Sequence, residues 1–141
     1  MREQIVEWHP IAGLNSPCAG VQIAEHNGEL TLTLLFSGVI GGSAGDLQLS
    51  FGRVLAFMSH EESTHPWNDS QTPQPTLKTG TALGGSVTFP CLEVVESEWI
   101  QSFGDSRLFG RGQPRHFQVV TLDKSVDVLT TQPVRGEWLG A

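Results

Sequence analysis

Residues 60–65 hold the side chains best suited to binding a metal or moving a proton. The segment places His60, Glu62 and His65 within six positions. Zinc-binding helices space two histidines four residues apart, so that both imidazoles lie on one face. A spacing of five turns the side chains about 140° apart on a helix, and Pro66 follows at once. The pattern favours a solvated loop without metal or cofactor, and a metal-binding or hydrolytic site on this loop is the alternative.

Residues 41–45 match the G-x-S-x-G pattern of serine hydrolases, with Ser43 in the position of the nucleophile. That motif requires a strand followed by a helix, a turn that exposes the serine oxygen beside backbone donors. Here residues 46–51 alternate between polar and apolar types like a strand. The motif therefore predicts a loop between antiparallel strands, and we expect no catalytic residue in the chain.

Three arginines, Arg107, Arg111 and Arg115, lie close together in a segment that contains two glycines. Their guanidinium groups are suited to gripping an acidic group on a partner. The same groups can instead pair with the acids of residues 93–105, which is the interpretation that the sequence favours.

Asp127 lies between Val126 and Val128 in a segment with the alternation of a strand. Its carboxylate must point away from the side that the valines share. If that side is covered, the carboxylate requires a partner, and Arg115 and His116 are the candidates.

The alternation of apolar and polar residues predicts two antiparallel hairpins. Residues 29–40 and 47–58 form the first pair, with the glycine-rich loop between them. Gly52 predicts a β-bulge, because Arg53 would otherwise point inward after Phe51. Residues 116–122 and 126–130 form the second hairpin, across a short polar gap.

Shorter elements complete the predicted fold. Residues 91–95 and a segment around residues 21–24 are expected to be strands. Residues 97–103 change to helical spacing, with Ser97 as the N-cap. Trp99, Ile100 and Phe103 share one face of this helix and are expected to be its buried contacts.

Together these elements predict one domain of residues 1–141. The expected fold is α+β and mostly β, a twisted antiparallel sheet of about five to seven strands with one short helix packed on it. Residues 59–86 are expected to form a long polar loop. Trp67 in that loop is either folded onto the core or held for a partner.

Composition narrows the class of partner. Hydrophobic residues make up 38% of the 141 residues and charged residues 16%, which is too apolar for a disordered chain. The net charge is −7, and residues 1–70 hold eight acids against two bases. This excess disfavours nucleic acid and anionic membranes as partners.

Cys18 and Cys91 could pair only if the fold brings them together, and buried free thiols in a cytoplasmic protein are the favoured expectation, since no secretory signal is evident at the start of this sequence.

Three segments of the last third of the chain carry a family resemblance. They are Ser97-Glu98-Trp99-Ile100, then Arg115-His116-Phe117-Gln118-Val119, and finally Asp123 followed by Val126-Asp127-Val128-Leu129. In these segments the chain resembles small bacterial proteins, some of which are grouped with the immunity proteins of polymorphic-toxin systems. The resemblance implies a cytoplasmic α+β protein that acts by binding one protein, and it implies no catalytic residue.

The sequence thus favours a non-enzymatic protein-binding domain, an immunity-type inhibitor that meets a basic toxin domain through an acidic surface. A homodimer formed through an exposed strand edge is a further possibility. The residues expected to contact the partner are Glu61, Glu62, Trp67, Asp69, Arg111, Arg115 and His116.

Overall fold

A computed structural model describes residues 3–14, 16–36, 45–61, 89–104 and 112–139 of the chain. Within these ranges the protein forms nine strands and one short helix, so the mostly-β class is confirmed. No helix of the described part is long and apolar enough to span a membrane. In chain order the elements are β1 (Gln4–Glu7), β2 (Gly20–His26), β3 (Glu29–Leu35), β4 (Leu47–Arg53), β5 (Ala56–His60), β6 (Cys91–Val95), α1 (Glu98–Ser102), β7 (Arg115–Val120), β8 (Ser125–Thr130) and β9 (Arg135–Trp138).

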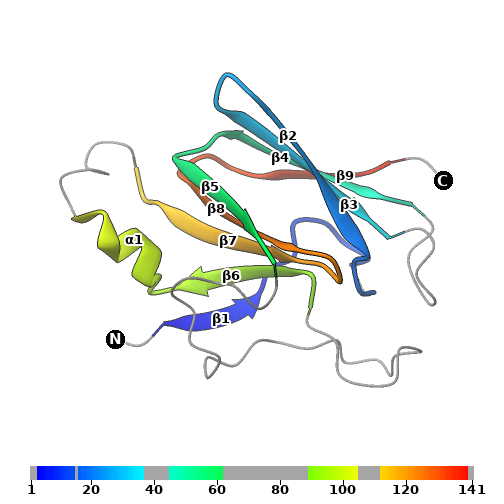
Figure 1. The fold of residues 1–141 in the computed structure, drawn as a ribbon, viewed down its shortest axis with the longest axis horizontal. Coiled ribbons are helices and arrows are strands. Elements are labelled where there is room, and N and C mark those ends of the chain that lie inside the picture. The colour runs from blue at the N-terminus through cyan, green and yellow to red at the C-terminus, as the bar shows by residue number, and fades with distance from the viewer. Residues whose placement is uncertain (1–2, 15, 37–44, 62–88, 105–111, 140–141) are drawn as a thin grey trace.

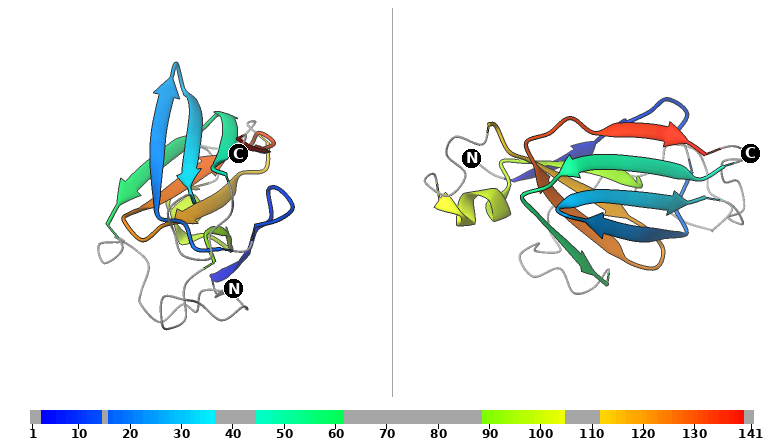
Figure 2. Two further views of the ribbon diagram at one scale, coloured as in Figure 1. Left: turned by 90° about the vertical axis from the view of Figure 1, so that its right-hand side faces the viewer. Right: turned by 90° about the horizontal axis from the view of Figure 1, so that it is seen from above.

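The strands are divided between two antiparallel sheets, where the sequence predicted one. The five-stranded sheet has the order β1-β6-β7-β8-β5, and the four-stranded sheet has the order β2-β3-β4-β9 (Figure 1). The views in Figure 2 show the two sheets stacked, with α1 at one end of the five-stranded sheet. Aromatic rings join the inner faces: the centroids of Phe51 in β4 and Phe117 in β7 lie 6.2 Å apart.

The first predicted hairpin is confirmed as the pair β3 and β4. Leu32 lies opposite Leu49, and both side chains are fully buried, as the alternation requires. The predicted bulge is also present. The register shifts between Leu30 and Thr31, and Gly52 takes a φ of +68°, a conformation that glycine adopts without strain. The bulge turns Arg53 outward, where its Nη1 donates to the Asn27 carbonyl 3.1 Å away.

The prediction that residues 47–58 form one strand is wrong. The chain leaves the four-stranded sheet at Val54, whose N–H donates to the Gly28 carbonyl over 3.0 Å. The next N–H, that of Leu55, donates to the Leu129 carbonyl in β8 over 2.8 Å. Two adjacent residues are therefore hydrogen-bonded to different sheets, and β5 continues as an edge strand of the second sheet.

The second hairpin is confirmed as β7 and β8, with Phe117 opposite Val128. The strands β2 and β6 are also confirmed near their predicted ranges. The two short edge strands β1 and β9 were not predicted. The expected long loop begins later than residue 59, because Ser59 and His60 belong to β5, and residues 62–88 lie outside the described ranges.

The short helix α1 begins where the sequence predicts. The side chain of Ser97 caps it, since its Oγ accepts the N–H of Ile100 over 3.2 Å. Trp99, Ile100 and Phe103 are only half-buried, not fully buried as expected. The helix therefore depends on its cap and on contacts with the sheet, because a single turn is not stable alone in water.

Candidate functional site

A cluster of polar side chains lies on the outer face of the five-stranded sheet, the face turned away from the four-stranded sheet. Along β7, Phe117 points inward to the other sheet, and its neighbours His116 and Gln118 point outward. Asp127 lies opposite Gln118 in β8 and shares this face. His60, at the end of β5, reaches the same place from the sheet edge.

The Asp127 carboxylate is the centre of the cluster. Its Oδ1 lies 2.6 Å from Nε2 of His116 and 3.2 Å from Nε2 of Gln118. Its Oδ2 lies 2.7 Å from Nε2 of His60. The carboxylate is fully buried, and the side chains of His60 and His116 are 8% and 1% exposed. Such a carboxylate is tolerated in the interior because several donors satisfy it.

The neighbouring atoms determine the protonation of the His60 imidazole. Nδ1 of His60 lies 2.9 Å from the Glu61 carbonyl, which can only accept, so this nitrogen carries a proton. Its Nε2 donates to Asp127, and His60 is therefore an imidazolium paired with a carboxylate. Nε2 of His116 lies 2.6 Å from Oδ1 of Asp127, and its Nδ1 lies 2.7 Å from Oγ of Ser97, so both of its ring nitrogens are hydrogen-bonded.

The pKa of His60 agrees with this geometry. Hydrogen bonding to the Asp127 carboxylate raises it above its ordinary value, burial acts in the opposite direction, and the Glu61 carbonyl raises it further. The two hydrogen bonds favour the charged imidazolium, and burial opposes it.

The cluster also fixes the start of α1. Ser97 is 3% exposed, and its Oγ both accepts from Ile100 and is hydrogen-bonded to His116. The ring of Trp99 meets the His116 ring edge-on, with centroids 5.3 Å apart. A chain of hydrogen bonds therefore runs from the helix cap across β7 and β8 to the edge strand β5.

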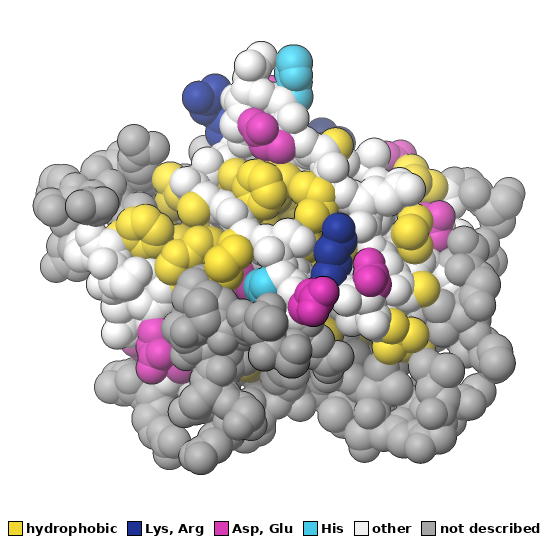
Figure 3. Space-filling model, in the orientation of Figure 1, with side chains coloured by type: hydrophobic (Ala, Val, Ile, Leu, Met, Phe, Trp, Pro, Cys, Tyr) yellow, Lys and Arg dark blue, Asp and Glu magenta, His cyan; other side chains and the backbone are white. Residues whose placement is uncertain are grey.

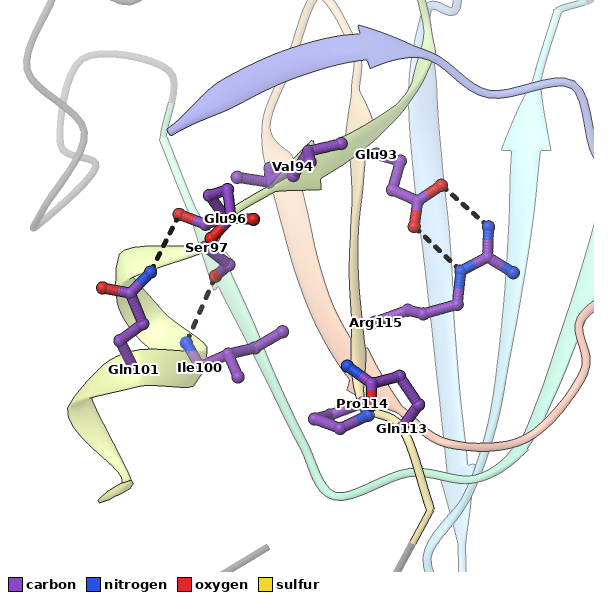
Figure 4. Close-up of a pocket in the computed structure, with 10 residues that line it drawn as sticks. Glu93, Val94, Glu96, Ser97, Ile100, Gln101, Gln113, Pro114 and Arg115 are labelled. Carbon is purple, nitrogen blue, oxygen red and sulfur yellow. Dashed lines mark hydrogen bonds and ion pairs between the residues drawn. The ribbon is translucent and has the colours of Figure 1, made fainter. Parts of the chain in front are cut away.

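A pocket of about 440 Å³ lies beside the cluster, between α1 and the adjoining ends of β6 and β7 (Figure 4). Ser97 and Ile100 line one side. On the opposite side Arg115 and Glu93 form a bidentate ion pair, with N–O distances of 2.7 and 2.8 Å. The guanidinium of Arg115 also lies 4.7 Å from the centre of the Phe117 ring. Arg115 is thus held by Glu93, within the range of acids expected from the sequence.

The residues expected to contact a partner occupy different settings. Glu61 is exposed, Arg115 pairs with Glu93, and His116 is buried in the cluster rather than on the surface. Four of the expected contact residues lie outside the described ranges, namely Glu62, Trp67, Asp69 and Arg111. Ser43, His65 and Arg107 also lie outside these ranges.

Within the described ranges no group of three or more histidine, cysteine or acidic side chains is arranged to hold a metal ion. Both ring nitrogens of His60 are engaged in hydrogen bonds. Cys18 and Cys91 are free and buried, as the sequence predicts. Burial raises the pKa of Cys18 to about 12, so its thiol is protonated at neutral pH.

The two edge strands of the four-stranded sheet differ in their contacts. The chain around Pro10 packs over one face of β9: a Cβ added to Gly136 would lie 3.0 Å from the Pro10 carbonyl oxygen. In addition, Nε1 of Trp138 donates to the Ala12 carbonyl over 2.9 Å. At the other edge, β2 has β3 as its one neighbour among the described strands. The β2–β3 hairpin projects beyond the rest of the ribbon (Figure 2, left).

Comparison with known protein families, curated proteins and solved structures gives no match for this chain. The site is therefore interpreted from its own geometry.

The sequence indicated parts of the cluster but not the whole. The alternation around Asp127 pointed to a buried carboxylate with His116 as a partner, and helical spacing pointed to Ser97 as a cap. His60 was assigned instead to a polar loop, because its partner Asp127 lies 67 positions further along the chain. No local pattern reports a contact of that range.

Proposed function

We propose that this chain is a non-enzymatic protein-binding domain, an immunity-type inhibitor that meets a basic toxin domain. The supporting observation is a set of exposed glutamates on its surface. Glu25, Glu29, Glu96 and Glu98 are exposed, and none forms an ion pair with lysine or arginine within the described ranges. Charge of one sign on a surface speeds the encounter with a partner of opposite sign and disfavours other partners.

The glutamates lie in two separate regions. Glu25 and Glu29 belong to the β2–β3 hairpin, whose projecting end shows acidic and histidine side chains at the top of Figure 3, beside a basic side chain from outside the hairpin. Glu96 and Glu98 flank Ser97 at the start of α1. The two pairs can therefore be reversed in charge separately, and each serves as the control for the other.

The test uses the product of the reading frame adjacent to this gene as the binding probe. We expect a complex at about 50 mM NaCl that weakens strongly at about 500 mM, because screening acts on exposed charges. At the lower salt concentration, changing the glutamate pair that contacts the partner to lysine should weaken the complex. Changing the other pair to lysine should have a small effect on the affinity. An affinity that is equal at both salt concentrations contradicts the acidic contact, and the absence of any complex contradicts the proposed partner.

A hydrolytic enzyme is the second candidate, and one observation favours it. Ser97 lines the pocket with its Oγ 2.7 Å from Nδ1 of His116, which is in turn oriented by Asp127. A nucleophile beside an oriented base is the general arrangement of covalent hydrolysis. Against it, Ser97 is 3% exposed and its oxygen caps α1.

A fluorophosphonate probe separates the two candidates. A hydrolase would be labelled at Ser97, and labelling would disappear in Ser97→Ala while remaining in Ser102→Ala, a serine on the exposed side of the same helix. For a binding domain we expect no labelling of the wild type, measured by intact mass.

A further inference from the structure

Apolar side chains lie in rows across the strands of the four-stranded sheet. Each row ends at the edge strand β2, where the last side chain is less buried than those of β3 and β4. Leu49 in β4, Leu32 in β3 and Ile23 in β2 lie side by side across the sheet. The two leucines are fully buried, whereas Ile23 packs against the core but remains half-buried. A further strand beside β2 would extend this row by one side chain and cover Ile23.

The next position on the same face of β2 carries charge. Glu25 lies two residues beyond Ile23, opposite Leu30. It is exposed, and its Oε2 accepts the N–H of Gly28 over 2.6 Å, which holds the carboxylate near the hairpin turn. An added strand would therefore place one side chain beside a fixed negative charge, and a lysine or arginine suits that position.

The opposite face of β2 carries no large apolar side chain. Gln22 and Ala24 lie on it, opposite Thr33 and Thr31, and both are exposed. Side chains of an added strand that point to this face need no apolar character. The two faces together specify an alternating pattern, with apolar and basic side chains on one face and small polar ones on the other.

We infer that β2 binds an extended segment of a partner protein by strand addition. The segment has apolar side chains beside Val21 and Ile23 and a lysine or arginine beside Glu25. This inference rests on the proposed binding of a basic protein and identifies the part of the surface that receives it. Main-chain hydrogen bonds supply the attachment, and alternate side chains supply the selectivity.

The probe is the synthetic peptide Lys-Thr-Val-Thr-Val-Thr-Lys, which has the length of β2. Its symmetric pattern presents a lysine to Glu25 whether it binds parallel or antiparallel. We expect amide chemical shifts of β2 and β3 to change on titration, with those of β9 unchanged. A peptide of the same composition in the order Lys-Val-Val-Thr-Thr-Thr-Lys should bind at least tenfold more weakly, because its valines point to opposite faces.

Charge exchange makes the test specific. Glu25→Lys should weaken the alternating peptide at least tenfold, and replacing both of its lysines with glutamate should restore binding to that variant. Glu137→Lys, in β9 at the opposite end of the sheet, is the matched control and should leave the affinity unchanged. Shift changes centred away from β2, or no binding of the peptide at millimolar concentration, would overturn the inference.

The outcome is separable from that of the proposed function. If the product of the adjacent reading frame binds with salt dependence but Glu25→Lys leaves that complex intact, strand addition at β2 is wrong and the binding function stands. If the peptide binds at β2 but that product does not bind, the edge is a docking site and the proposed partner is wrong.

Discussion

The buried cluster of the five-stranded sheet and the open edge of the four-stranded sheet place charge in opposite settings. Asp127 is surrounded by three donors from β5 and β7 and has no exposure to water. Glu25 on β2 is exposed and makes no ion pair within the described ranges. A charge in the first setting holds strands together, and a charge in the second is available to a partner. The same chemical group thus serves stability at one place and, in the proposed function, recognition at the other.

Asp127→Ala should cause the largest loss of stability. It leaves the His60 imidazolium and the N–H groups of His116 and Gln118 without their acceptor, and breaking a buried pair in this way costs about 3–5 kcal/mol. The measurement is urea unfolding near pH 6. Asp123→Ala, in the exposed turn between β7 and β8, is the control and should change stability by less than about 0.5 kcal/mol. Equal effects of the two variants would show that the cluster does not hold the sheet.

The second prediction concerns pH and removes only one of these contacts. The folded pKa of His60 lies above its unfolded value, so its stabilisation is complete below about pH 6.5 and is lost as the pH rises through the folded pKa. The free energy of unfolding should therefore fall over this range more steeply for the wild type than for His60→Gln. Parallel pH profiles of the two proteins would contradict the imidazolium assignment.

Ser97→Ala should have a smaller effect. It removes the cap of α1 and the hydroxyl that is hydrogen-bonded to His116, and loss of a cap costs about 1 kcal/mol. Hydrogen exchange should show faster exchange of the Ile100 amide. Ser102→Ala is the matched control, since its exposed hydroxyl bonds only to the Trp99 carbonyl. Protection of Ile100 that is unchanged in Ser97→Ala would mean that the cap does not hold the helix.

Ala24→Lys should have the smallest effect on stability, within about 0.5 kcal/mol, because the side chain is exposed on the edge strand β2. Its effect should appear in binding alone, since a lysine on an edge hinders the approach of another strand. Thermal unfolding and titration with the alternating peptide measure the two quantities. A large loss of stability would show that this side chain of β2 contributes to folding, as the buried cluster does, and would contradict the contrast between the two regions.

Local patterns could predict the elements whose contacts are near in sequence. The alternation of β3, β4, β7 and β8 was sufficient for both hairpins, and Gly52 with Arg53 was sufficient for the bulge. The division into two sheets could not be predicted. It depends on the backbone N–H groups of Val54 and Leu55, which donate to carbonyls far apart in the sequence, Gly28 and Leu129.

The candidate site was predictable in its parts. Asp127, His116 and Ser97 each carried a local signal for one contact. The assembly of these residues into one cluster with His60 carried no such signal. It requires β5 to lie beside β8, and no spacing in the sequence reports that pairing. The edge position of β2 was hidden for a similar reason, since it depends on the strand order β2-β3-β4-β9, in which β2 has β3 as its one neighbour among the described strands.

The pairing of β4 with β9 has a consequence for biosynthesis. Leu47 is paired with Trp138, and the Trp138 indole bonds to the Ala12 carbonyl, 126 positions earlier in the chain. During synthesis β2, β3 and β4 emerge before β9, so β4 lacks its partner strand until that tryptophan has emerged. Pairing between segments so far apart in the chain slows folding and leaves the earlier strands exposed to mispairing during synthesis.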